Sequence, residues 1–146
     1  MKALLYVFVA VAGALTSVES GANAKLTKTL GGPWWPSILF SLISLLCLAA
    51  VTLFAGGRFP TDKMAAVPWW AWTGGVVSAI YIVSMLIAPA QLGAGLFTGL
   101  TVTAAVITSI ALDNWGLVGF EVHPAGIGRL IGGALMVIGI ICVAVF

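Results

Sequence analysis

The sequence predicts an all-α integral membrane protein with five transmembrane helices. Of its 146 residues, 62% are hydrophobic and 7% are charged, whereas a soluble domain carries roughly 25% charged residues. The charged residues are also clustered, because none occurs in residues 34–57 or 64–112. Apolar stretches of about 18 residues or more are long enough to cross a bilayer, and a soluble fold could not bury this much apolar surface.

The first three predicted helices are separated by two polar segments that contain glycine and proline. These segments are residues 25–33, KLTKTLGGP, and residues 56–63, GGRFPTDK. Gly and Pro interrupt helices, so the predicted spans are 3–23, 35–55 and 68–88. Helices are expected rather than strands because an open strand edge has no hydrogen-bonding partner in lipid.

The remaining apolar sequence supplies two more helices. Residues 68–112 are about twice the length of one span. Pro89 disfavours helical backbone in the residue before it, so we predict a break there and a fourth helix over 91–112. A polar loop follows, and a fifth helix covers 125–146. We treat residues 1–146 as a single transmembrane domain.

The N-terminal segment has a second interpretation, as a cleavable signal peptide. Lys2 precedes an apolar run, and residues 22–24, Ala-Asn-Ala, resemble a small-residue cleavage site. Lys25 and Lys28 follow directly, as they would at the end of a transmembrane helix. Cleavage would leave four spans.

The first helix carries the polar side chains best placed to bind a solute. Glu19 lies inside a predicted span, where charged residues are costly and tend to face the bundle interior or a cavity. Asn23 is four residues further on and Ser20 is adjacent, so these side chains line one side of the helix. We predict that Glu19, Ser20 and Asn23 bind a substrate or a proton. The alternative is that Glu19 reaches the lipid headgroups or pairs with Lys25.

Tryptophans cluster at the starts of two predicted spans, as is typical of the membrane interface. They are Trp34, Trp35, Trp69 and Trp70. Trp72 and Tyr81 lie deeper in the third helix. Aromatic faces attract organic cations, so we include Trp72 and Tyr81 among the candidate substrate-binding residues.

Small residues four positions apart favour close helix packing in lipid. They occur at Gly13-Ser17, Ala71-Gly75-Ala79, Gly95-Gly99-Thr103 and Gly128-Gly132. The loop before the fifth helix is instead charged, and we expect a solvated turn in which Asp113 caps a helix or forms a local salt bridge.

Enzymatic signatures are absent from the sequence. It contains no HExxH, P-loop or GxSxG motif, and Cys47 and Cys142 lie in separate apolar segments. His123 has no partner at metal-ligand spacing, and no basic stripe indicates nucleic-acid binding. We therefore predict no enzyme, cofactor, metal or nucleic-acid partner, which leaves transport, channel formation or a structural role.

Lys and Arg in the short loops give only a small charge asymmetry. Four lie on the side of the N-terminus and two on the other side, namely Lys2, Arg58, Lys63 and Arg129 against Lys25 and Lys28. The excess favours a cytoplasmic N-terminus. It is small enough to leave insertion in both orientations open.

Several short motifs follow one another in a characteristic order. They are Asn23-Ala24-Lys25-Leu26, Pro68-Trp69-Trp70 with Gly74-Gly75 and Tyr81, Ala88-Pro89 with Gly93, Leu112-Asp113-Asn114-Trp115-Gly116-Leu117, and Arg129 with Gly132 and Gly139. In this order and spacing they resemble the small five-helix branch of the bacterial drug/metabolite transporter superfamily. The resemblance covers nearly the whole chain.

This resemblance implies a half-size secondary transporter in the bacterial inner membrane, surrounded by lipid. Two such chains are expected to pair antiparallel as a homodimer of ten helices in inverted repeat, or one chain pairs with a separately encoded half. The substrate would be a small organic solute or cation, bound near the midplane. Glu19 is similar in placement to the first-helix glutamate of the small multidrug resistance proteins, although nearer the helix end, which implies proton-coupled export as one option. The alternatives are a non-transporting membrane subunit or assembly factor, and a passive channel.

Overall fold

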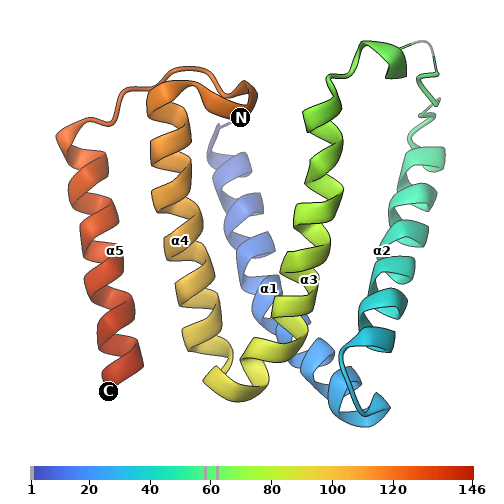
Figure 1. The fold of residues 1–146 in the computed structure, drawn as a ribbon, viewed down its shortest axis with the longest axis horizontal. Helices are drawn as coiled ribbons and strands as arrows, with labels where there is room; N and C mark the ends of the chain where they lie inside the picture. The colour runs from blue at the N-terminus through green and yellow to red at the C-terminus, as the bar shows by residue number, and fades with distance from the viewer. Residues whose placement is uncertain (1, 58, 62) are drawn as a thin grey trace. The chain divides into compact units, whose positions relative to one another are not determined.

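The computed structural model describes residues 2–57, 59–61 and 63–146, and these form five helices long and apolar enough to cross a membrane (Figure 1). The helices are α1 (Lys2–Leu30), α2 (Trp34–Phe54), α3 (Thr73–Leu92), α4 (Ala94–Trp115) and α5 (Ile127–Val145). Short 3-10 helices are η1 (Met64–Ala66), η2 (Trp69–Trp72) and η3 (Leu117–Gly119). Arg58, which enters the charge asymmetry of the loops, lies outside the described residues. The prediction of five membrane-spanning helices is confirmed.

The first helix is longer than the sequence pattern predicts, because it ends at Leu30 rather than at residue 23. Residues 24–30 contain neither Gly nor Pro, so nothing in them interrupts the helix. Gly31 takes a φ of +74°, and the Gly32 N–H donates to the Thr27 carbonyl oxygen at 3.2 Å. This is the hydrogen bond of a Schellman motif, for which glycine supplies the left-handed residue.

The third helix passes through Pro89 and ends at Leu92, so the predicted break at Pro89 is wrong. Pro89 falls in the last turn of the helix and removes one backbone hydrogen bond, the one to the Met85 carbonyl oxygen, while the helix continues for three more residues. The helix is interrupted at Gly93, whose φ of +83° is one that residues with a Cβ rarely adopt.

The chain divides into two compact units, Met1–Gln91 and Leu92–Phe146. In the first unit α1 contacts α2, and α2 runs antiparallel to both α1 and α3 (Figure 1). The buried residues of this unit are Ser20, Asn23, Pro36, Met85, Leu86 and Pro89. They come from the second half of α1, the start of α2 and the second half of α3, and these segments lie at the same end of the unit (Figure 1).

The second unit is built on the packing of α4 against α5. Gly99 lies so close to the Ile140 side chain that a Cβ at Gly99 would overlap it, and Thr103, one turn further along α4, is buried. Gly133 is buried on α5, with the Ile110 Cδ1 atom 3.7 Å from the position of a Cβ. On α4, Gly99 and Thr103 therefore lie at the helix contact, as the small-residue spacing predicts.

On α5 the predicted small-residue pair is not the contact. A Cβ at Gly128 or at Gly132 would meet no atom within 4 Å among the described residues. Gly133, the next residue along, faces α4 instead. A helix turns by about 100° per residue, so Gly132 and Gly133 lie on different faces of α5.

Candidate functional site

The polar side chains of α1 are buried on one face of the helix. Ser20 is 1% exposed and Asn23 is 2% exposed. Thr27 follows four residues after Asn23 and is half-buried. Residues spaced three, four and seven apart project from the same side of a helix. We call Ser20, Asn23 and Thr27 the α1 polar face.

Each member of the α1 polar face has a polar atom without a partner. Ser20 Oγ, Asn23 Nδ2 and Thr27 Oγ1 are buried and have no hydrogen-bond partner among the described residues. Two other hydroxyls of α1 bond within the helix: Thr16 Oγ1 donates to the Gly13 carbonyl oxygen at 2.7 Å, and Thr29 Oγ1 donates to the Lys25 carbonyl oxygen at 2.9 Å. A buried polar group left without a partner costs roughly 1–3 kcal/mol. This face is therefore suited to a ligand or water that offers hydrogen bonds.

Glu19 lies beside Ser20 and is half-buried. Within the described part of the chain it forms no ion pair with Lys25, which is exposed. Six residues along a helix turn it by about 240° beyond a full turn, so these two side chains point in different directions. The carboxylate is thus left beside the α1 polar face.

Trp72 and Tyr81 are not part of the same constellation. Trp72 is 56% exposed and belongs to η2, which precedes α3 at the opposite end of the first unit from the end of α1 (Figure 1). Tyr81 is 46% exposed, midway along α3. The structure therefore brings Ser20 and Asn23 together, with Glu19 adjacent, and leaves Trp72 apart.

Thr27 is the one member of the α1 polar face that the sequence pattern misses. The predicted first helix ended at residue 23, so Thr27 fell in a predicted loop. Thr27 lies four residues after Asn23, and this spacing places it on the same face only if the helix continues beyond residue 23, as it does to Leu30.

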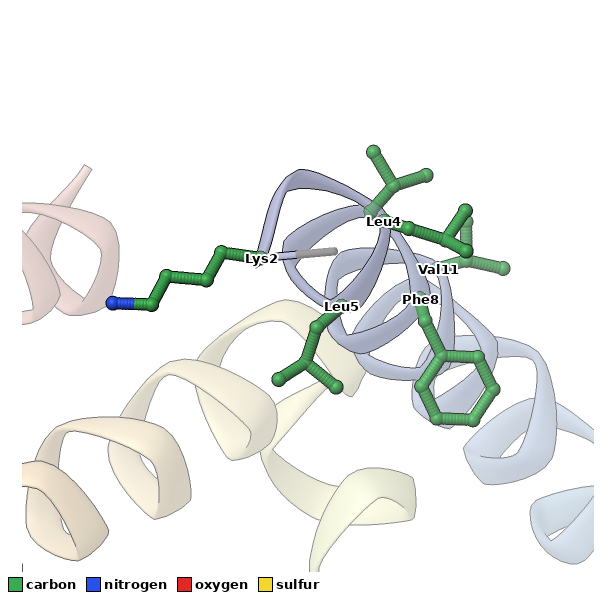
Figure 2. Close-up of a pocket in the computed structure, with 6 residues that line it drawn as sticks. Lys2, Leu4, Leu5, Phe8 and Val11 are labelled. Atoms are coloured by element: carbon green, nitrogen blue, oxygen red, sulfur yellow. The ribbon is translucent and has the colours of Figure 1, made fainter.

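A hollow on the first turns of α1 is a different kind of surface. It is lined by Lys2, Leu4, Leu5, Val7, Phe8 and Val11, all from this one helix. Figure 2 shows Lys2 extending away from the side on which Leu4 and Val11 lie, with Leu5 and Phe8 below. Leu4 is 76% exposed and Phe8 is 68% exposed. Exposed apolar side chains of this kind suit contact with lipid tails rather than selective binding.

A polar cluster closes the loop between α4 and α5. Arg129 Nη1 donates to Asp113 Oδ2 at 3.3 Å and to the His123 carbonyl oxygen at 3.3 Å. Asn114 Oδ1 accepts a hydrogen bond from the Ala125 N–H at 3.0 Å. The predicted local salt bridge of Asp113 is confirmed, and its partner is Arg129.

Comparison with protein families identifies a family for this chain. The model of a drug/metabolite transporter-type family, DMT_YdcZ, described as "Putative inner membrane exporter, YdcZ", matches residues 4–142. Neither a curated protein nor a solved structure matches the chain. The matched range reaches from α1 into α5, and it confirms the resemblance to drug/metabolite transporters. Together with the five apolar helices, it assigns the chain to the inner membrane as a multi-pass protein in contact with lipid.

Proposed function

The chain belongs to the DMT_YdcZ family of inner membrane exporters, and on that premise we propose that it is a secondary transporter that exports a small organic solute or cation. Family membership favours a transporter over an enzyme. The α1 polar face is the observation that supports a solute site in this chain. We propose that Ser20 and Asn23 contact the solute, with Thr27 beside them.

The physical reason is the cost of burying polar groups. Polar residues in membrane helices tend to face the bundle interior or a cavity. Ser20 and Asn23 are almost fully buried, yet one polar atom of each has no partner among the described residues. A solute with hydroxyl, carbonyl or amino groups would supply those hydrogen bonds while bound. Its departure would leave them unmade, which suits a site that must bind and then release.

Glu19 adds charge next to this face. A half-buried carboxylate can bind a cationic solute directly, or can alternate between the solute and a proton. We propose the second role, in which proton binding at Glu19 competes with solute binding and couples the two fluxes. Trp72 and Tyr81 remain candidates for contact with solute along its path rather than at the α1 polar face.

We propose that the working transporter is an antiparallel dimer. Two copies of five helices give ten helices in inverted repeat, the arrangement by which many secondary transporters alternate access to a midplane site. No span has more than 17% of its most apolar window buried within the chain. Lipid or a second copy must cover the rest, which is consistent with a partner.

Transport by everted inner-membrane vesicles tests this function. Vesicles with and without the chain are incubated with a defined mixture of organic cations, amino acids, sugars and carboxylates, and their contents are identified by mass spectrometry. We expect at least one solute to accumulate at a saturable rate that Ser20→Ala reduces. Ser17→Ala is the matched control, because Ser17 lies one turn earlier and is exposed. Non-saturable uptake would indicate a passive channel, and no uptake would favour a non-transporting subunit.

Glu19→Gln tests the proton coupling separately. We expect solute transport to lose its dependence on the pH gradient, whereas Glu121→Gln, in the exposed loop before α5, should leave that dependence intact. Unchanged pH dependence in Glu19→Gln would exclude the proposed role of this carboxylate.

The dimer has its own test in the orientation of the chain. Compartment-sensitive reporters fused to the C-terminus should reveal both orientations in comparable amounts if one chain pairs with itself. A single orientation would contradict the homodimer and direct attention to a separately encoded partner of opposite orientation.

A further inference from the structure

A hollow of about 400 Å³ lies along the seam between α4 and α5, close to the loop that joins them. Its walls are apolar over most of its length and include Ile107, Ile110, Leu130 and Val137. The buried Gly133 lies among them, and side-chain atoms of Ile110 and Ile107 lie 3.7 and 3.9 Å from its Cβ position. Asn114 and Arg129 make one end polar. The hollow is therefore amphipathic along its length.

The polar end of this hollow retains hydrogen-bonding capacity. Arg129 uses Nη1 for both of its hydrogen bonds, to Asp113 and to the His123 carbonyl. A guanidinium has five N–H donors on three nitrogens, and the other two nitrogens have no partner among the residues described. Asn114 uses its Oδ1 to hold the Ala125 N–H, and within the same described set its Nδ2 is likewise free to donate.

Arg129, at this end, is paired with Asp113, which lines the neighbouring hollow along the same two helices rather than this one. Arg129 Nη1 and Asp113 Oδ2 are 3.3 Å apart, and their side chains remain 44% and 26% exposed. Trp115 also lines the hollow and is 67% exposed, as is common for tryptophan at the level of lipid headgroups. The exposed ion pair offers a cation and an anion to the same ligand.

We propose that this hollow binds a zwitterionic phospholipid, with an acyl chain along the seam between α4 and α5 and the phosphate at Arg129. Guanidinium groups bind phosphate through directed hydrogen bonds. The headgroup ammonium lies toward Asp113, so that both charges of the headgroup meet a charge of opposite sign. An apolar wall with one polar end matches the two parts of a lipid, and the helices that form it stand in the bilayer where phospholipid is the solvent. The site belongs to α4 and α5 and does not depend on a role for the α1 polar face.

Native mass spectrometry of the full chain in detergent tests the site, with dioleoyl phosphatidylethanolamine as the probe. We expect one tightly bound lipid per chain, and about tenfold weaker binding in Arg129→Gln, which is the effect of losing a hydrogen bond to a charged group. Ala134→Phe should weaken binding similarly, because Ala134 lines the hollow and a phenyl ring would fill it. This second variant leaves the Arg129 contacts intact.

Two controls make the result decisive. Ala144→Phe is the matched control, since Ala144 is an exposed α5 residue outside the hollow, and it should bind lipid as the unmodified chain does. Dioleoylglycerol, which has the same acyl chains and no phosphate, should bind about tenfold more weakly for the reason that applies to Arg129→Gln. Equal binding of dioleoylglycerol, equally strong binding of inorganic phosphate alone, or unchanged lipid binding in Ala134→Phe would overturn the proposal.

Discussion

Arg129 Nη1 lies 3.3 Å from Asp113 Oδ2, so an ion pair joins the first turn of α5 to the last turn of α4. The His123 N–H donates to the Asp113 carbonyl oxygen at 2.9 Å, and the His123 carbonyl accepts from Arg129 at 3.3 Å. Asp113 and Arg129 therefore hold both the two helix ends and the loop between them.

A double-mutant cycle on this pair should give a small coupling free energy. We expect Asp113→Asn and Arg129→Gln to couple by roughly 0.2–1 kcal/mol, because both side chains are partly exposed to solvent. The coupling should shrink in about 1 M salt, where the Debye length is about 3 Å. Unfolding by denaturant in detergent micelles measures it. Additive effects of the two substitutions at low salt would contradict a stabilising pair.

Gly116→Ala should destabilise the chain. Gly116 caps α4 with a φ of +61°, and a Cβ there would lie 2.7 Å from Val122 Cγ2. A residue with a Cβ pays about 1–2 kcal/mol for left-handed backbone. Gly126→Ala is the matched control, because Gly126 has a φ of −68° and no atom of the described residues within 4 Å of its Cβ position. Equal melting temperatures for these two variants would refute the capping role.

Gly99→Val should disturb the contact between α4 and α5. The new side chain would overlap Ile140, and overpacking of this kind costs about 1–3 kcal/mol. Ile140→Ala in the same chain should restore part of the lost stability by making room. A Cβ at Gly95, one turn earlier on α4, would meet nothing within 4 Å among the described residues, so we expect Gly95→Val to be tolerated. Thermal unfolding distinguishes the three variants, and no rescue by Ile140→Ala would count against this packing.

Substitution in the α1 polar face should separate stability from transport. Asn23→Leu and Thr27→Val remove buried polar atoms that have no partner in the described chain. We expect a melting temperature equal to or above that of the unmodified protein, because each unpartnered group costs roughly 1–3 kcal/mol. Transport should fall, since the solute would lose its hydrogen bonds. A lower melting temperature would mean that these side chains stabilise the fold through partners of their own.

Sequence predicted the number of spans because three of the apolar runs are close to one bilayer thickness and residues 68–112 are close to two. The helix ends followed less well, since they depend on individual backbone conformations. α1 continues past Lys25 to Leu30, and the break before α4 comes at Gly93 rather than Pro89. In both places a glycine with positive φ, Gly31 or Gly93, ends the helix. The helix passes through the nearby polar residue Lys25 in α1 and through Pro89 in α3.

The α1 polar face was partly predictable from the sequence. Ser20 and Asn23 follow from helical spacing alone, whereas Thr27 needs the longer helix. Burial is a property of packing, and sequence could not distinguish buried Ser20 from exposed Ser17. The hollow between α4 and α5 likewise depends on Gly133 rather than Gly132 facing α4, a difference of one position that composition does not reveal.

Reconstitution of the purified chain, alone, into proteoliposomes tests the central claim most directly. The solute found with everted vesicles is supplied on one side with an imposed pH gradient, and its initial rate of movement is measured against concentration. We predict a saturable rate that depends on the gradient and is lost in Asn23→Leu. A rate that is zero without a second protein, or that rises linearly with concentration, would contradict transport by this chain through the α1 polar face.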